Sequence, residues 1–358
     1  MARTENSNFN VTGILERVVS MNASDLHLTV GTPPVVRVNR LLSPLSDMSP
    51  LLTEDVDLFL SQVLDADQKD IFDVNRELDF SVGLGNKARF RVNAFYQKGY
   101  PSVSLRLIPM MVPSLDTLGL PPVISSLCEL RQGLVLVVGP TGHGKSTTLA
   151  AMLDRINQTR AEHIVTIEDP IEYIFTNKKS LIEQREMHTD TSSWDLALRA
   201  VLRQDPDIVM IGEMRDHETM QAALNIAETG HLVLATLHTN SASQTVERII
   251  SSFPEERQNE VRLQLAQIIE VVLSLRLMPS KQGKVVPSVE IMLASEAVKN
   301  LIREGKTQHL DNIISTSGNL GMVSLERSLA QLVIEDIVSE EEAIKYALKP
   351  EEFRRLLK

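Results

Sequence analysis

The sequence predicts an α/β protein with a parallel-sheet core, preceded by a smaller α+β domain and followed by a helical tail. After the first third of the chain, short runs of β-branched and other apolar residues alternate with helical patterns. This alternation is typical of a parallel sheet covered by helices on both faces. One run leads directly into the glycine-rich segment GPTGHGKS, a pattern that cradles phosphate groups between a strand and a helix.

The composition is that of a globular protein. With 358 residues and roughly 150 residues per domain, we expect two or three domains. A net charge of −11 argues against a general attraction to nucleic acid or anionic lipid. The single cysteine, Cys128, excludes an internal disulfide and a thiolate metal cluster. The sequence shows no secretory signal peptide and no apolar run of roughly 20 residues. The chain is therefore expected to be cytoplasmic and to contact a membrane only through partners.

Residues 1–112 are expected to form the N-terminal domain. A β-hairpin is predicted around Lys98-Gly99-Tyr100-Pro101, and its alternation places Arg89, Arg91 and Arg106 on one shared face. Exposed arginines on strands usually serve solubility or a salt bridge. A third use is to complete the ATP site of a neighbouring subunit.

Four prolines precede the predicted core. They disfavour regular structure, so residues 113–122 are expected to be a linker. Residues 123–294 form the predicted core, with a helix from Lys145 and another that follows Ser192 or Ser193 and stops before Pro206. Residues 295–358 are expected to be a helical C-terminal subdomain. The predicted core strands are Leu134–Val138, Ile164–Ile167, Ile208–Ile211 and Leu232–Thr236.

The glycine-rich segment matches the P-loop pattern G-x-x-x-x-G-K-[ST]. Its glycines let backbone N–H groups turn toward phosphates, Lys145 supplies a charge, and the Ser146 hydroxyl can bind Mg²⁺. The strand before it and the helix after it argue against a chance match. His143 is assigned no role beyond the loop surface. The expected nucleotide-binding residues are Gly139, Pro140, Thr141, Gly142, His143, Gly144, Lys145, Ser146 and Thr147.

Acidic residues follow two other predicted strands. Glu213 follows Ile208–Ile211, and the segment from Glu168 to Glu172 follows Ile164–Ile167. Ligands of open α/β sheets bind at the carboxyl ends of the strands, where such acids reach Mg²⁺ or orient water. Any one of them alone is as readily a solvated loop acid, but two acidic strand ends beside one P-loop favour a catalytic role.

Two histidines, His231 and His238, bracket the apolar run Leu232–Thr236. A straight strand spans roughly 3.3 Å per residue, so the two side chains cannot share one metal ion. Their spacing alone favours core or capping roles.

Four segments occur in an order that resembles the secretion ATPase superfamily of type II secretion and type IV pili, and within it the pilus retraction ATPases of the PilT type. They are ASDLHLTVGTPPVVRV (Ala23–Val38), TIEDPIEY, DPDIVMIGEMRD and GHLVLATLHTNSA. EAVKNLIREGK (Glu296–Lys306) resembles the AIRNLIRE motif of the retraction family. The resemblance implies a RecA-like P-loop ATPase core, an N-terminal PAS-like domain and a helical C-terminal tail.

The resemblance also implies residue roles. Glu172 would activate water, and Glu213 would be the Walker B acid that acts through Mg²⁺ or water. The implied catalytic residues are Glu172, Glu213, Lys145, Arg91 and Arg106; the implied Mg²⁺ ligands are Ser146, Glu172 and Glu213; and the implied sensors of nucleotide state are His231, His238 and Arg248.

The implied function is a homohexameric, Mg²⁺-dependent ATPase that uses ATP to retract type IV pili and so drives twitching motility. It would be recruited to the inner face of the cytoplasmic membrane by a platform protein, with a second retraction ATPase as an optional partner and no direct nucleic-acid contact. The alternatives are an accessory retraction ATPase of the PilU type, another member of the superfamily, a RecA-like nucleic-acid motor, and a scaffold that hydrolyses little ATP. Departures from the retraction pattern occur at His143, Val298-Lys299 and Leu275-Arg276.

Overall fold

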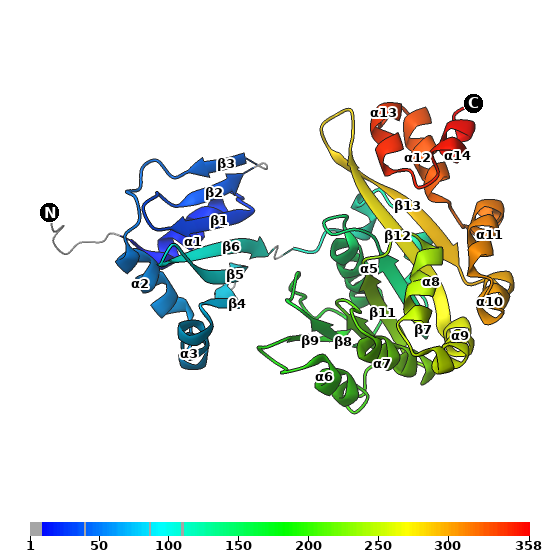
Figure 1. Cartoon of the computed structure of the whole chain (residues 1–358), viewed down its shortest axis with the longest axis horizontal. Helices are drawn as coiled ribbons and strands as arrows, with labels where there is room; N and C mark the ends of the chain where they lie inside the picture. Colours follow the sequence, from blue (N-terminus) through cyan, green and yellow to red (C-terminus); the bar gives the residue numbers. More distant parts are fainter. Residues whose placement is uncertain (1–8, 39–40, 86, 109–110) are drawn as a thin grey trace. The chain divides into compact units, whose positions relative to one another are not determined.

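The chain folds as two units, shown in Figure 1. The computed structural model describes residues 9–38, 41–85, 87–108 and 111–358. The first unit is Met1–Met111 with Glu172–Ile174, and the second is Val112–Ile171 with Phe175–Lys358. Among the described residues, no helix is long and apolar enough to cross a membrane.

The first unit is a six-stranded sheet in the order β3-β2-β1-β6-β5-β4, with every neighbouring pair antiparallel. Three helices pack on its buried face around one core that includes Leu26, Phe59 and Phe90. The strands are β1 (Asp25–Thr29), β2 (Val35–Val38), β3 (Leu41–Pro44), β4 (Glu77–Leu84), β5 (Ala88–Gln97) and β6 (Tyr100–Ile108). The helices are α1 (Val11–Ser20), α2 (Thr53–Val63) and α3 (Ala66–Asn75).

The predicted hairpin is confirmed as β5 and β6. The two strands turn at Lys98 and Gly99, both of which have a positive φ. Val92 faces Leu105 on the buried side, and Arg91 faces Arg106 on the other side. The alternation of apolar and basic residues therefore produces the expected cationic face.

The second unit holds a seven-stranded sheet in the order β13-β12-β7-β11-β10-β8-β9. All neighbouring strands are parallel except β12 and β13, which form an antiparallel hairpin. Four strands match predicted ones: β7 (Gly133–Val138), β8 (His163–Glu168), β10 (Ile208–Ile211) and β11 (Leu232–Leu237). Three had not been predicted: β9 (Leu181–Glu186), β12 (Ile269–Pro279) and β13 (Val285–Leu293).

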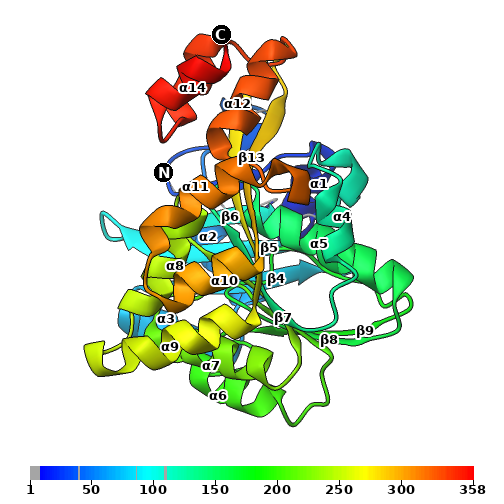
Figure 2. The same cartoon turned by 90° about the vertical axis from the view of Figure 1, so that its right-hand side faces the viewer.

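Helices cover both faces of this sheet, as Figure 2 shows. In β7, Leu134 and Leu136 join the core on one face, whereas Val135 and Val137 join the core on the other. The first face is covered by α6 (Trp194–Val201), α7 (His217–Glu228), α8 (Ala242–Ser251) and α9 (Glu255–Ile268). The second is covered by α4 (Val123–Leu127) and α5 (Lys145–Thr159). Burial on both faces explains why β7 reads as a continuous apolar run.

The segment 113–122, predicted to be a linker, is part of the second unit. It contains the 3₁₀ helix Leu115–Thr117, and Leu115 is buried in the same core as Ile124 and Leu149. The linker interpretation is therefore corrected: the prolines limit regular structure, but the apolar residues between them still pack on the core.

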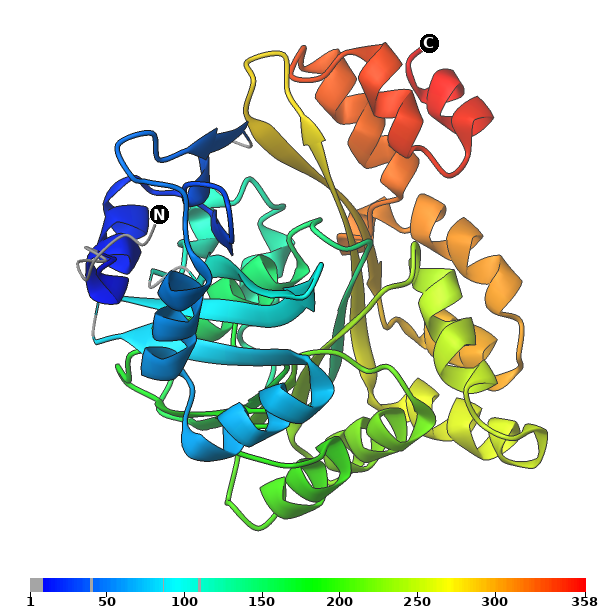
Figure 3. The same ribbon diagram turned by 60° about the vertical axis from the view of Figure 1, so that its left-hand side comes forward.

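The C-terminal region is helical, as predicted. Figure 3 shows the hairpin β12–β13, in yellow, running toward the last helices, in orange and red. Met278 of β12 packs in a separate core with Leu325, Leu329 and Phe353. The helices are α10 (Glu296–Arg303), α11 (Leu310–Thr316), α12 (Leu325–Ile334), α13 (Glu340–Ala343) and α14 (Pro350–Leu356).

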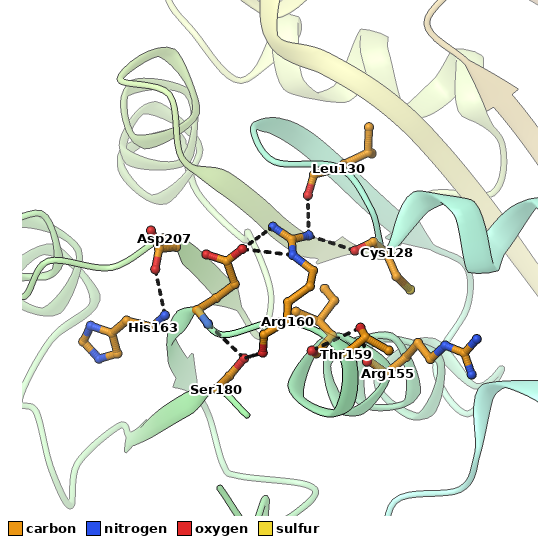
Figure 4. Close-up of polar contacts among 10 residues, drawn as sticks. Cys128, Leu130, Arg155, Thr159, Arg160, His163, Ser180 and Asp207 are labelled. Atoms are coloured by element: carbon orange, nitrogen blue, oxygen red, sulfur yellow. Dashed lines mark hydrogen bonds and ion pairs between the residues drawn. The ribbon is translucent and has the colours of Figure 1, made fainter. Parts of the chain in front are cut away.

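Arg160 anchors the C-terminal end of α5 (Figure 4). Its guanidinium donates to the carbonyls of Cys128 at 2.8 Å and Leu130 at 2.6 Å, and to Glu162 Oε1 at 2.9 and 3.0 Å. The Ser180 hydroxyl donates to the Arg160 carbonyl at 2.8 Å. The helix that carries Lys145 at its first turn is thus tied down at its last turn.

Candidate nucleotide-binding site

The P-loop joins β7 to α5, as its sequence pattern predicts. Gly139 has φ 144° and Gly144 has φ 86°, a region that side-chain-bearing residues rarely adopt. A Cβ on Gly139 would lie 2.6 Å from the Leu275 carbonyl oxygen, so only glycine fits there. The loop can therefore approach β12 closely before it enters the helix.

The first turn of α5 is suited to an anion. It carries no acidic residue, and no side chain in the described part of the chain caps its N-terminus. The first N–H groups of any helix lack partners within the helix, and the helix dipole adds positive charge at that end. The segment around Gly144 and Lys145 therefore offers backbone N–H groups and positive charge to a phosphate group.

Lys145 is only 7% exposed. Its Nζ donates to the carbonyls of Gly139 at 2.8 Å and Pro140 at 3.0 Å, and lies 3.4 Å from Nδ1 of His238. The ammonium is thus held within the P-loop, where a phosphate oxygen is the partner that its charge favours.

Glu213 lies at the carboxyl edge of the same sheet, one residue beyond Gly212 at the end of β10. The Gly212 N–H donates to the Ile167 carbonyl at 2.8 Å, and the Thr236 hydroxyl donates to the Gly212 carbonyl. The Met214 N–H donates to the Thr236 carbonyl at 3.0 Å. Both neighbouring strands therefore hold the turn from which the carboxylate projects.

The Glu213 carboxylate is ionised. It forms an ion pair with Arg215 and a hydrogen bond, at 3.0 Å, with Nε2 of His238, and its side chain is 16% exposed. Burial pushes the pKa of Glu213 up, but the hydrogen bonds and charges of Arg215 and His238 outweigh burial and lower that pKa below its usual value. A carboxylate in this state stays ionised and can accept hydrogen bonds from water or bind a cation.

His238 joins the acid to the P-loop. Its Nε2 contacts Glu213 at 3.0 Å, and its Nδ1 lies 3.4 Å from both Lys145 Nζ and Thr141 Oγ1. The ring can do so because β11, which ends just before it, lies between β7 and β10. Its side chain is 50% exposed. The core or capping role that spacing alone favoured is therefore wrong for His238.

His231 lies at the opposite edge of the sheet. Its Nδ1 contacts the Thr229 hydroxyl at 2.9 Å and the Ile226 carbonyl at 3.1 Å, just beyond the end of α7. The intervening strand separates it from His238 by about 20 Å. The structure does not bring His231 to the P-loop, and the local capping role fits its contacts.

The acids at and beyond the end of β8 differ in their surroundings. Glu168 is buried and accepts from the Thr166 hydroxyl at 2.7 Å and the Gln184 amide at 3.1 Å, so it serves the sheet. Glu172 is exposed in the loop beyond β8, and Glu172–Ile174 group with the first unit.

Arg106 and Arg37 share a partner that sequence reasoning missed. Asp25, 8% exposed, lies opposite both Arg37 and Arg106 in the sheet register. Its carboxylate accepts from Arg106 Nε at 3.0 Å and lies 3.4 Å from Arg37 Nε. Arg106 still has a 70% exposed side chain, and Arg91 is exposed beside it. The only sequence signal for this partner is Asp25 itself, an acidic residue within the segment ASDLHL.

Arg248 lies on the exposed side of α8. It is the basic residue in the last turn of that helix.

The comparisons with known proteins agree with this geometry. Residues 8–348 match the family described as type II/IV secretion system protein. The chain is 43% identical over 343 residues to the type IV pilus retraction ATPase PilT of Pseudomonas aeruginosa, which covers 96% of this chain and 99% of that protein. The chain belongs to the type II/IV secretion system protein family. The predicted resemblance is confirmed.

Two further relatives extend the comparison within the type II/IV secretion system family. The chain is 38% identical over 346 residues to the type IV pilus ATPase PilU of Pseudomonas aeruginosa, covering 96% of this chain and 90% of that protein. A crystal structure of the pilus retraction motor PilT with bound ADP matches with a TM-score of 0.91 and 42% identity, over 97% of this chain and 99% of that one. The predicted fold class, a RecA-like P-loop ATPase core with a PAS-like domain and a helical tail, is confirmed.

His143, expected to lie on the loop surface, instead joins the P-loop to β12 in this member of the type II/IV secretion system family. Its Nδ1 accepts from the Leu277 N–H at 2.9 Å, and its ring meets Tyr346 edge-on at 6.3 Å. Nδ1 can accept only when it carries no proton. Burial, followed by the charges of Arg276 and Lys145, lowers the pKa of His143 and so favours the neutral ring.

Replacement of His143 should change both stability and its pH dependence. We expect His143→Ala to lower the free energy of unfolding by about 1 kcal/mol, because the Leu277 N–H loses its acceptor. In the wild type this contribution is present above the unfolded-state pKa and is lost as pH falls through the lower folded-state pKa. His143→Asn, whose amide oxygen accepts at any pH, should lack this loss. Thermal unfolding midpoints between about pH 7.5 and pH 5 measure it, and identical slopes for wild type and His143→Asn would contradict the assignment.

Proposed function

We propose that the chain is the subunit of a hexameric motor that hydrolyses ATP, with Mg²⁺, to retract type IV pili. The observation that carries the proposal is the cluster of Lys145, His238 and Glu213 at one sheet edge, in a chain similar to PilT along nearly its whole length. Phosphoryl transfer requires a loop that binds the phosphates and a nearby carboxylate that binds Mg²⁺ or orients water.

The proposed division of labour follows from where the charges lie. The P-loop backbone and Lys145 bind the phosphates, and Lys145 exchanges its carbonyl partners for phosphate oxygens. Mg²⁺ usually binds one or two carboxylates together with phosphates, which it neutralises during transfer. Ser146 and Glu213 supply oxygen ligands of that kind, and in the proposal Glu172 adds a third or activates water.

The remaining roles are proposed as follows. His238 senses nucleotide state, because its ring contacts both the Walker B acid and the P-loop lysine. Arg91 and Arg106 stabilise transition-state charge, and Asp25 holds Arg106 in place. Arg248, on α8, is proposed as a further sensor of nucleotide state. No sensor role is proposed for His231, since its contacts lie at the other sheet edge.

The proposed partners are five further copies of this chain in a homohexamer and a platform protein of the inner membrane, at whose cytoplasmic face the motor works. An accessory PilU-type ATPase is a possible second motor. The accessory role is also the second candidate for this chain itself, supported by 38% identity to PilU, against 43% to PilT.

Removal of either charged group of the cluster should stop hydrolysis. We expect Lys145→Ala and Glu213→Ala to lower ATP turnover by a hundredfold or more, on the order of what preorganised charge contributes. Phosphate release by the purified proteins measures this, and circular dichroism checks that both variants fold. Lys284→Ala, at the exposed β12–β13 turn, is the matched control and should turn over normally. Wild-type turnover in either site variant would contradict the site.

Deletion of the gene should distinguish retraction from extension. A strain without the motor should keep or accumulate surface pili while losing twitching, because assembled pili can no longer be withdrawn. Wild-type protein should restore twitching, and Lys145→Ala should not. Loss of surface pili on deletion would instead identify an extension motor.

Arg106→Ala should impair chemistry more than binding. A group that acts mainly on transition-state charge affects turnover, by about a hundredfold here, while nucleotide affinity changes little. Steady-state kinetics and the affinity for ADP separate the two. Arg17→Ala, which removes an exposed arginine paired with Asp47 in the same unit, is the control. An Arg106→Ala variant with unchanged turnover would remove this residue from the mechanism.

A further inference from the structure

Arg276 is a buried charge near the site to which no role has been given. It lies on β12 with 4% of its surface exposed. A buried guanidinium is costly unless its donors are satisfied. Its donors reach the Leu275 carbonyl at 2.8 Å, the Asn240 carbonyl at 2.7 Å and the Asn240 side-chain oxygen at 3.2 Å. Two of its three acceptors thus belong to one loop residue.

That loop carries His238. Asn240 lies two residues beyond His238, between β11 and α8. The Ser274 hydroxyl donates to the same Asn240 carbonyl at 3.1 Å. On the other side, the Ala242 N–H donates to Glu290 at 2.6 Å. Residues of β12 and β13 therefore hold the loop from which the His238 ring reaches the site.

The charge of Arg276 has a compensating neighbour. Burial lowers the pKa of Arg276, and the negative charge of Glu290 on β13 opposes that change. Burial also raises the pKa of Glu290 to about 7, so this charge is partial near neutral pH. Ser274, two residues before Arg276, lies opposite Glu290 in the register of the hairpin. An arginine guanidinium stays charged in proteins, so its hydrogen bonds to Asn240 are charge-assisted.

The same stretch of β12 also contacts the P-loop. The Leu275 carbonyl lies against Gly139, where a Cβ would come within 2.6 Å of it, and the Leu277 N–H donates to His143 at 2.9 Å. Four consecutive residues, 274–277, thus contact both the P-loop and the loop of His238. This strand therefore adds to the strand pairing of β7 with β11 in setting the relative placement of Lys145 and His238.

We propose that Arg276 is a positioning residue for ATP hydrolysis: by fixing Asn240, it holds the His238 ring between Glu213 and Lys145. This inference rests on the proposed ATPase function. Without Arg276, the Asn240 carbonyl keeps only the Ser274 hydroxyl, and the His238 ring gains freedom to leave Glu213. The phosphate cradle is made by the P-loop backbone and is unaffected, so the cost falls on turnover and not on binding.

The test compares Arg276→Met and Arg276→Lys with the wild-type full chain, using Mg-ATP as substrate and ADP as the binding probe. We expect Arg276→Met to lower kcat about tenfold, with KM and ADP affinity within about twofold of wild type. Arg276→Lys, which keeps one charged donor, should recover part of the loss. Ser288→Ala is the matched control: Ser288 faces Arg276 across the hairpin and is also buried, but its hydroxyl has no hydrogen-bond partner among the described residues.

A double-mutant cycle separates positioning from general destabilisation. In a His238→Ala background, Arg276→Met should change kcat less than about twofold, because the ring it positions is gone. A full tenfold effect in that background would overturn the inference, as would a wild-type kcat in Arg276→Met. If Arg276→Met does not fold, Ser274→Ala removes a weaker donor to the same carbonyl. It should lower kcat about threefold with the same dependence on His238, and an unchanged kcat overturns the inference.

Failure of the inference can be told apart from failure of the proposed function. A wild-type protein that hydrolyses no ATP overturns both. A wild-type protein that hydrolyses ATP, together with Arg276 variants at full kcat, overturns only the positioning role and leaves the ATPase assignment intact.

Discussion

The parallel pairing of β7 with β11, and of β11 with β10, is the constraint on which the site depends. Val138 pairs with Leu237, and Ile211 pairs with Ala235, so the three strands end at the same edge within a few residues of one another. Parallel strands place all their carboxyl ends at one edge of the sheet, so the residues that follow each strand lie close together. Lys145, His238 and Glu213 therefore come together, while His231, before the start of the same strand, is carried to the far edge.

Charge compensation explains how this edge tolerates several buried ionic groups. Lys145 is held by carbonyl oxygens, Glu213 by Arg215 and His238, and Arg276 by carbonyls with Glu290 nearby. A buried charge without a partner would cost several kcal/mol. Each charged group thus has a partner in the folded chain. When phosphate oxygens replace the carbonyl partners of Lys145, its charge is never left unpaired in an apolar environment.

The sequence predicted the P-loop, the central strands and the acidic strand end of Glu213, and it missed the individual side-chain partners that meet through the fold. The P-loop and the four central strands have local signals, namely glycines at fixed spacing and apolar runs between turns. β12 begins at Ile269, directly after the last residue of α9, Ile268. No turn residue marks the start of this strand in the sequence. The bond from Leu277 to His143, like that from Arg276 to Asn240, links segments that no periodicity connects. Side-chain partners of this kind follow only from the strand order.

The hairpin that positions the site loops also limits how the second unit can move. One residue beyond 274–277, Met278 packs among the C-terminal helices with Leu325 and Leu329, and the Lys281 N–H donates to the Ile337 carbonyl at 2.9 Å. Beyond Ser274, β12 is paired with β13 alone, so a movement of those helices against the sheet would have to bend this hairpin or give up the buried contact. The C-terminal helices and the site edge of the sheet are therefore expected to move as one body, and a change at the P-loop that shifts β12 reaches the last helices directly.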